Sequence, residues 1–246
     1  MLKKNKHAYF FHNLPPDKVL AIFSDRTYNL GFYSTASQKL RAKRQSFLKP
    51  LGINFRNLVC TKQPHLNKII LIKENHKGKG SSNFKDAISG VDGLITKTKH
   101  LPLAVFSADC LSIFLFDPKN EAVGLLHAGW RGTYKKISQN AILKMQKIFG
   151  TNPNDLLVSF GPAIRKCCYE VGFKFRKYFS SDLIKRKNKL FLDLIEANLK
   201  QLINTGVKKK NIFDCKICTS CQNKRFFSYR REKEKAGRMM SLMMLK

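Results

Sequence analysis

The amino-acid sequence predicts an α+β fold, in which helices and mixed sheets form layers within a single domain over residues 1–246. Most apolar runs have the length of a strand, and several follow one another without a helix between them. Helical periodicity occurs in few segments, so the strand-helix alternation of a doubly wound parallel sheet is missing. No Gly/Ser/Pro-rich linker interrupts the chain, and a hydrophobic content of 43% is ample for one core.

Apolar runs and turn residues place the elements of the first half of the chain. We expect strands at residues 19–23, 55–61, 68–73 and 92–96. A helical pattern at 38–48 ends near Pro50 and Gly52. The lysine- and glycine-rich segment 77–82 is expected to form a flexible loop.

The second half of the chain carries longer apolar runs. We expect strands at residues 111–116, 123–126, 156–160, 211–213, 226–229 and 239–245. An amphipathic helix is expected at 134–149, with Gly150 as its stop. A second helix is expected to begin after Asp193, which can cap it, and to end at Gly206.

Cysteine usage and hydropathy indicate a soluble cytoplasmic protein. The seven cysteines are odd in number, which argues against a secreted disulfide framework. The N-terminus is basic, but the apolar stretch after it is broken by His12, Asn13 and two prolines. No later run approaches the ~20 apolar residues of a membrane span.

The net charge of +31 favours attraction to polyanions. It arises from 47 Lys and Arg against 16 Asp and Glu. A nucleic-acid-binding module is therefore one candidate function. The excess is mostly lysine spread along the whole chain, whereas a dedicated binder concentrates its charge on one face, so we favour compositional bias as the explanation.

A cysteine and a histidine stand at the ends of two neighbouring apolar runs. Cys110 precedes the strand expected at 111–116, and His127 follows the strand expected at 123–126. His127 opens a loop that contains two glycines, Trp130 and Arg131. Side chains at such places lie where a ligand can approach the backbone. Two chemistries use this pair: Cys110 as a nucleophile with His127 as its base in a hydrolase or deamidase, or both residues as metal ligands.

A catalytic zinc ion needs a third protein ligand and an open fourth position. His65, in the turn between the strands expected at 55–61 and 68–73, is the best placed. His76 and His100 are rivals, but they lie in lysine-rich loops that we expect to be solvated. The set His65, Cys110 and His127 is thus the candidate zinc site.

Two further groups of residues could bind ligands. Cys215, Cys218 and Cys221 have the C-x2-C-x2-C spacing of half a zinc or iron-sulfur site, which Cys167 and Cys168 could help to complete. Structural thiols in a reduced compartment are the alternative that we favour. Near the glycines and aromatic residues, arginines form a candidate anion site: Arg131, Arg230, Arg231 and Arg238.

Several motifs together resemble the YfiH-type family of purine nucleoside phosphorylases, once labelled polyphenol oxidases or laccase-like proteins. They occur in order from about Gln63 to the C-terminus: Ala108-Asp-Cys110, His127-Ala-Gly-Trp-Arg-Gly132, Gly161-Pro-Ala-Ile164, Cys168-Tyr-Glu-Val-Gly172, Cys218-Thr219, Phe227-Ser-Tyr-Arg-Arg231 and Gly237-Arg238.

The resemblance implies a fold, a metal and an activity. The fold is a single-domain layered α/β/β/α sandwich with mixed sheets, and the metal is zinc, held by His65, Cys110 and His127. The activity is phosphorolysis of adenosine, inosine and methylthioadenosine to free base and ribose 1-phosphate, together with adenosine deamination. Purine nucleosides and phosphate are then the partners.

The implied chemistry assigns roles to more residues. Phosphate must be held against the ribosyl carbon, a task for which we propose Arg131 with Arg230 or Arg231. Asp109 would either shuttle a proton or orient its neighbours. One cysteine and two histidines can also bind copper, but multicopper chemistry requires many more histidines than the six present.

The sequence departs from the family pattern at three places. Leu66 stands where family members have a glycine after the histidine, and Asp25 stands where they commonly have an arginine. The stretch Glu232-Lys-Glu-Lys235 before Gly237 is also atypical. An aspartate in the site would repel phosphate. We expect zinc binding to survive these changes better than substrate preference does.

Overall fold

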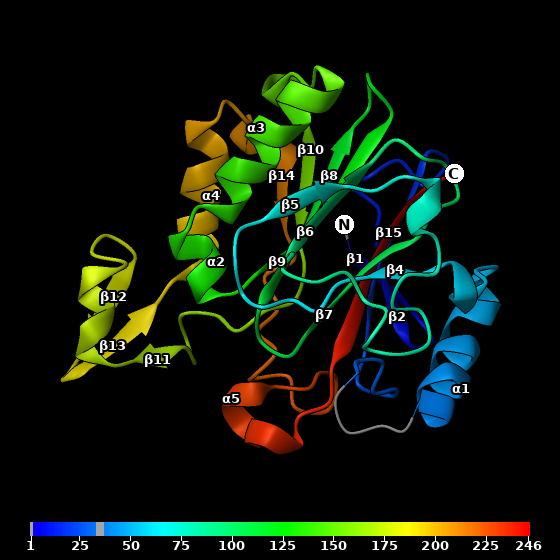
Figure 1. Ribbon diagram of the computed structural model, residues 1–246. Coiled ribbons are helices and arrows are strands. Elements are labelled where there is room, and N and C mark those ends of the chain that lie inside the picture. Colours follow the sequence, from blue (N-terminus) through cyan, green and yellow to red (C-terminus); the bar gives the residue numbers. More distant parts are fainter. Residues whose placement is uncertain (1, 33–36) are drawn as a thin grey trace.

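A computed structural model describes residues 2–32 and 37–246 and shows two six-stranded mixed sheets packed face to face, with helices on both outer faces (Figure 1). This arrangement confirms the α+β class and the α/β/β/α layering expected from the sequence. None of the described helices is long and apolar enough to cross a membrane.

The first sheet is built from both ends of the chain. Its strands in spatial order are β1 (Leu2–Asn5), β2 (Ala8–Phe11), β3 (Val19–Ser24), β15 (Met239–Leu245), β7 (Leu103–Ser107) and β4 (Val59–Cys60). All neighbours are antiparallel except β4 and β7. The strand latest in the sequence, β15, therefore lies in the middle of this sheet.

The second sheet comes from the central part of the chain. Its strands in spatial order are β14 (Ile212–Asp214), β10 (Leu157–Phe160), β8 (Leu111–Asp117), β9 (Ala122–Ala128), β6 (Gly93–Thr96) and β5 (Ile69–Leu71). Only the two outer pairs, β14 with β10 and β6 with β5, are parallel.

The two faces of β8 separate two hydrophobic cores. Phe114 and Phe116 point into the core between the sheets, where Phe114 packs against Phe11 with ring centroids 4.5 Å apart. Ile113 and Leu115 point to the opposite face and pack under the helices. Every residue of β8 is buried, as expected for a strand covered on both faces.

Helices cover the outer faces of both sheets (Figure 1). α1 (Ser37–Leu48) packs on the first sheet, and α3 (Ile137–Phe149) and α4 (Leu194–Asn204) pack on the second. Asp193 caps α4 by accepting a hydrogen bond from the backbone N–H of Glu196, as the sequence predicts. Two short helices, α2 (Trp130–Tyr134) and α5 (Tyr229–Glu232), lie next to the site described below.

Three sequence expectations are wrong in detail. Residues 55–61 contain only the short strand β4, because Asn54 accepts a hydrogen bond from the backbone of Arg56 and starts a 3-10 turn. The helix expected at 134–149 begins at Ile137, after a left-handed residue at Lys136. Residues 226–229 form no strand, since Ser228 instead caps α5.

Several strands were not expected from the sequence. These are β7, the hairpin of β1 and β2, and a small antiparallel sheet of β11 (Glu170–Val171), β13 (Lys189–Leu192) and β12 (Leu183–Arg186). This small sheet projects away from the two large ones (Figure 1). The segment that leads into it forms one wall of the site.

Candidate functional site

A cavity of about 710 Å³ opens at the edge where the chain passes from the first large sheet to the second. β7 of the first sheet ends at Ser107, the chain turns through Ala108 and Asp109, and β8 of the second sheet starts at Leu111. Asp109 sits in the left-handed region, with φ of 95°. This sharp corner presents Cys110 to the cavity, while β9 brings His127 beside it.

His65, Cys110 and His127 come together as the sequence predicts. One ligand atom from each of the three residues lies within 4.8 Å of the others. The two imidazole rings meet edge to face, with centroids 4.9 Å apart. His127 is buried, whereas His65 and Cys110 are partly open to the cavity.

Gln63 fixes the loop that carries His65 to the backbone of Phe106. Gln63 donates to the backbone oxygen of Phe106 and accepts from its N–H, at 2.7 and 2.8 Å. Gln63 and His65 both have positive φ, at 48° and 64°. Leu66 does not, so the absence of a glycine after His65 leaves the backbone unstrained.

Asp92 connects the two histidines and was not predicted as a site residue. Its Oδ1 accepts from the backbone N–H of His65 at 3.1 Å and lies 2.8 Å from Nδ1 of His127. Its Oδ2 accepts from the backbone of Leu66 at 2.7 Å. Because Nδ1 of His127 faces the fully buried carboxylate, Nε2 is left for a metal ion, the arrangement usual for metal-binding histidines.

The cysteine and the histidine form an ion pair. Removal from water would raise the pKa of Cys110, but the neighbouring His127 and hydrogen bonds from both histidines lower it to about 6. Burial would lower the pKa of His127, but the charge of Cys110 and the hydrogen bond to Asp92 raise it to about 9. At neutral pH the pair therefore consists of a thiolate and an imidazolium.

The glycines of the His127–Gly132 motif allow this close packing. A Cβ atom on Gly129 would lie 3.0 Å from both Sγ of Cys110 and Cδ2 of His65. A Cβ atom on Gly132 would lie 2.6 Å from the backbone oxygen of Leu66. A larger residue at Gly129 would crowd two of the three ligands, and one at Gly132 would displace the backbone that follows His65.

Asp109 lines the cavity, but its carboxylate already has several donors. Oδ1 accepts from Thr219 at 2.7 Å, and Oδ2 accepts from Ser228 at 2.9 Å and from the backbone N–H of Arg230 at 2.7 Å. These contacts hold the start of α5 against the corner. Of the two roles considered for Asp109, the geometry supports orientation of its neighbours.

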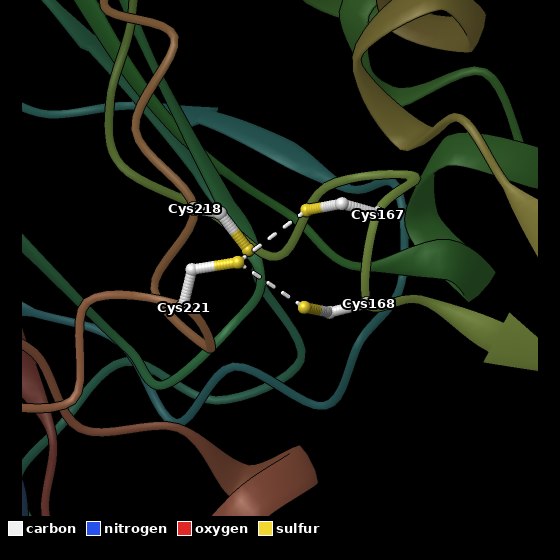
Figure 2. Close-up of side chains that lie close together, drawn as sticks. All are labelled: Cys167, Cys168, Cys218 and Cys221. Atoms are coloured by element: carbon white, nitrogen blue, oxygen red, sulfur yellow. Dashed lines mark hydrogen bonds between the residues drawn. The ribbon is translucent and has the colours of Figure 1, made fainter.

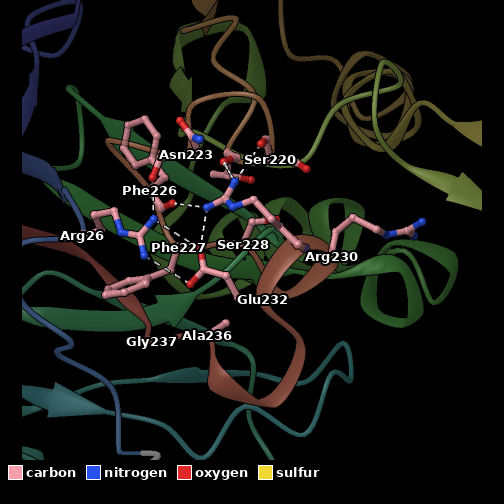
Figure 3. Close-up of polar contacts among 12 residues, drawn as sticks. Arg26, Ser220, Asn223, Phe226, Phe227, Ser228, Arg230, Glu232, Ala236 and Gly237 are labelled. Atoms are coloured by element: carbon pink, nitrogen blue, oxygen red, sulfur yellow. Dashed lines mark hydrogen bonds and ion pairs between the residues drawn. The ribbon is translucent and has the colours of Figure 1, made fainter.

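Two of the three arginines proposed for phosphate line the cavity. Arg131 lies over the ring of Trp130, and Arg230 lies near Tyr169 while donating to the backbone oxygen of Glu170. Figure 3 shows Arg230 extending away from the contacts around Arg26 and Glu232.

The structure does not bring Arg231 to the cavity. Its guanidinium donates to the backbone oxygens of Thr219, Ser220 and Phe226 and pairs with Glu232. These contacts hold together the segment before α5. Arg231 therefore stabilises a segment next to the cavity and does not line the cavity itself.

Sequence reasoning missed much of the cavity lining. Three further cationic side chains, Lys62, Lys233 and Arg238, reach the cavity, and of these only Arg238 belonged to a motif. The cations outnumber the lining acids, Asp109 and Glu170. Aromatic side chains form two of its walls: Phe32, Phe84 and Phe106 on one side, and Trp130, Tyr169 and Phe175 on the other.

Other expected candidates lie elsewhere. His76 is bonded to the backbone of Lys73 in an exposed turn, and neither it nor His100 joins the three ligands. Asp25 is buried outside the cavity, with Lys4 3.4 Å away. Asp25 therefore does not line the cavity, and an effect of Asp25 on phosphate stays a prediction.

Known proteins resemble this chain in sequence and in fold. YlmD of Geobacillus stearothermophilus, named a purine nucleoside phosphorylase, is 34% identical over 207 residues, covering 80% of this chain and 76% of that protein. Its crystal structure superposes with a TM-score of 0.93 at 29% identity, covering 99% and 98% of the two chains.

Two other proteins are similarly close. The crystal structure of the hypothetical protein YfiH of Bacillus licheniformis gives a TM-score of 0.93 at 27% identity, covering 100% of this chain and 99% of that one. A protein named adenosine deaminase RL5, from an unknown prokaryotic organism, is 31% identical over 204 residues, covering 79% of this chain and 78% of that protein.

The profile of one protein family, described as multi-copper polyphenol oxidoreductase laccase, matches residues 22–246. The match includes every residue of the cavity discussed above. The chain belongs to this enzyme family, together with the YlmD and YfiH proteins.

Proposed function

We propose that the chain is a zinc-dependent purine nucleoside phosphorylase that also deaminates adenosine. The observation that carries the proposal is one cavity that combines two histidines and a thiolate with aromatic walls and an excess of cations. The names of the relatives support the same class of substrate.

The donor set fits a catalytic zinc ion. Two imidazoles and one thiolate are ligands that zinc prefers, and the cavity leaves room for a fourth, exchangeable position. The family description names copper, but these three side chains could hold one ion, not a multicopper cluster. When bound, zinc supplies Lewis acidity at that open position.

The chain's own residues would bind and orient the nucleoside. The aromatic side chains on the two walls offer faces for a purine base. Arg131 and Arg230, with Lys62, Lys233 and Arg238 around them, offer positive charge to phosphate. In phosphorolysis a phosphate oxygen forms a bond to C1′ of the ribose while the bond from C1′ to N9 of the base breaks.

The test is a product assay on purified protein whose metal content has been measured. The protein is incubated with adenosine or inosine, with and without phosphate, while free base, ribose 1-phosphate and ammonia are measured. We expect phosphate-dependent release of base and, from adenosine, ammonia. Loss of both in Cys110→Ala and His127→Ala, with activity kept in the control His76→Ala, supports the proposal. Equal product from wild type and the two site variants overturns it.

The ion pair of Cys110 and His127 favours a second candidate, a hydrolase or deamidase with Cys110 as nucleophile. The two candidates differ at His65, which a metal site requires and a cysteine-histidine dyad does not. Activity that survives both His65→Ala and a chelator would favour the dyad.

A further inference from the structure

Four cysteines that the proposed activity does not use converge on one side of the cavity. Cys167 and Cys168 come from the segment after β10, and Cys218 and Cys221 from the segment after β14 (Figure 2). Sγ of Cys221 lies 3.6 Å from Sγ of Cys167 and 3.3 Å from Sγ of Cys168. All four sulfur atoms lie within 4.8 Å of one another.

The grouping differs from the one that sequence spacing indicates. Cys215 begins the C-x2-C-x2-C run but is not part of the group. The adjacent pair Cys167-Cys168, which has no recognisable metal spacing, supplies the other two sulfur atoms. The four cysteines therefore come from two segments about fifty residues apart in the sequence.

Backbone contacts bring the two segments together independently of the sulfur atoms. Ala163 pairs with Cys218 in an isolated parallel bridge. The backbone N–H of Thr219 donates to the oxygen of Ala163, and the N–H of Ala163 donates to the oxygen of Ile217. The turn at Cys218 closes with a hydrogen bond from Gln222. The scaffold is thus built without help from the thiols.

We propose that Cys167, Cys168, Cys218 and Cys221 bind a structural zinc ion, separate from the site at Cys110. Four sulfur ligands in a compact group suit tetrahedral zinc, and a closed set of four protein ligands leaves no position for substrate. A disulfide would use only two of the four sulfur atoms. Sγ of Cys221 lies close to both Cys167 and Cys168, whereas a disulfide could join it to only one of them.

The proposed ion would join two walls of the cavity. Cys168 is followed directly by Tyr169 and Glu170, which line the cavity. Cys218 is followed by Thr219, which holds Asp109. A zinc ion bound to both segments would fix the distance between them, in the way that a disulfide staples a small domain.

Metal analysis in a background without the first site tests the proposal. In the double variant His65→Ala, Cys110→Ser, expressed with zinc and purified under reducing conditions, we expect about one zinc ion per chain. Adding Cys221→Ser, or Cys167→Ser should the former not fold, removes that ion. Adding Cys215→Ser, the matched control from the same cysteine run, does not. Replacement of zinc by cobalt should give strong sulfur-to-metal absorption in the background protein and in the control only.

Three results would overturn the proposal. The first is a folded background protein that contains no zinc. The second is zinc that remains after both Cys167→Ser and Cys221→Ser. The third is a count of free thiols, taken after denaturation of the wild type purified without reductant, that reveals a disulfide within the group. Iron found in place of zinc would overturn the choice of metal. None of these readouts depends on nucleoside chemistry, so they stand or fall separately from the proposed activity.

Discussion

Asp92 is the residue on which both histidines of the site depend. Its carboxylate faces Nδ1 of His127 and fixes the backbone at His65 and Leu66. Asp92→Asn keeps the shape of the side chain but replaces one of its two acceptor oxygens by an NH2 group, which cannot accept a hydrogen bond. We expect the affinity for zinc to fall about 10- to 100-fold, as for other changes behind metal-binding histidines.

Competition with a chelating dye would measure the effect of Asp92→Asn. Asp117→Asn is a suitable control, because Asp117 is also buried but caps a turn at the far end of β8. Equal zinc affinity in wild type and Asp92→Asn would refute the role given to Asp92.

The ion pair predicts how zinc binding depends on pH. The pKa of Cys110 is about 6 and that of His127 about 9, so between these values the metal-free pair holds one proton, on His127. Zinc must expel this proton, and its apparent affinity should rise about tenfold per pH unit from pH 6 to 9 and then level off. Below pH 6 the thiol also has to lose a proton, which steepens the dependence.

Chelator competition across this pH range, together with calorimetry in buffers of different ionisation enthalpy, would count the protons. An affinity that does not change between pH 6 and 9 would contradict the charge state described here.

The sequence predicted Cys110, His127 and His65 as site residues, because each stands at a strand end or in a turn. Asp92 was not predicted as a site residue, since an acid before a strand carries no distinctive signal. Lys233 stood out only as part of the atypical stretch before Gly237, with no role assigned to it. Arg231 was indistinguishable from Arg230 in sequence, and only the direction of each side chain separates them.

Among the elements, the corner between β7 and β8 holds the start of α5, and with it Arg230, beside the cavity. Asp109→Asn would place an amide against one of the three donors that the carboxylate now accepts. An unsatisfied buried group costs about 1–3 kcal/mol, so we expect a lower melting temperature. Because α5 carries Arg230, we also expect a higher KM for phosphate with zinc content unchanged.

Phosphorolysis kinetics and metal analysis of the same preparation would separate these effects. Asp117→Asn, which alters a buried acceptor in the turn at the far end of β8, outside the cavity lining, is a control for general destabilisation. A loss of zinc with an unchanged KM would show that Asp109 serves the metal site instead.

Three strands buried on both faces, β8, β9 and β15, were predicted well, because each is a continuous apolar run. β7 is equally buried but shorter, and it was not predicted. Residues 226–229 are just as apolar, yet a serine that caps α5 breaks the pattern. The small sheet of β11 to β13 is half-exposed and rich in lysine, so neither run length nor alternation marks it.

For the molecule as a whole, the charge of +31 predicts weak attraction to any polyanion. We expect binding to DNA or RNA at low ionic strength that falls steeply with added salt and shows no sequence preference. Cys110→Ala should bind the nucleic acid equally well, because the substitution leaves all 47 Lys and Arg residues in place. Fluorescence anisotropy with labelled duplexes over a salt series would measure this. Tight binding at physiological salt would revive the nucleic-acid function.

The position of β15 has a consequence during synthesis. This strand is latest in the sequence yet lies between β3 and β7, with Arg238 of the cavity just before it. Until it leaves the ribosome, β3 and β7 present unpaired edges to the surrounding solution. The first sheet can therefore be completed only after residues 239–245 have been synthesised.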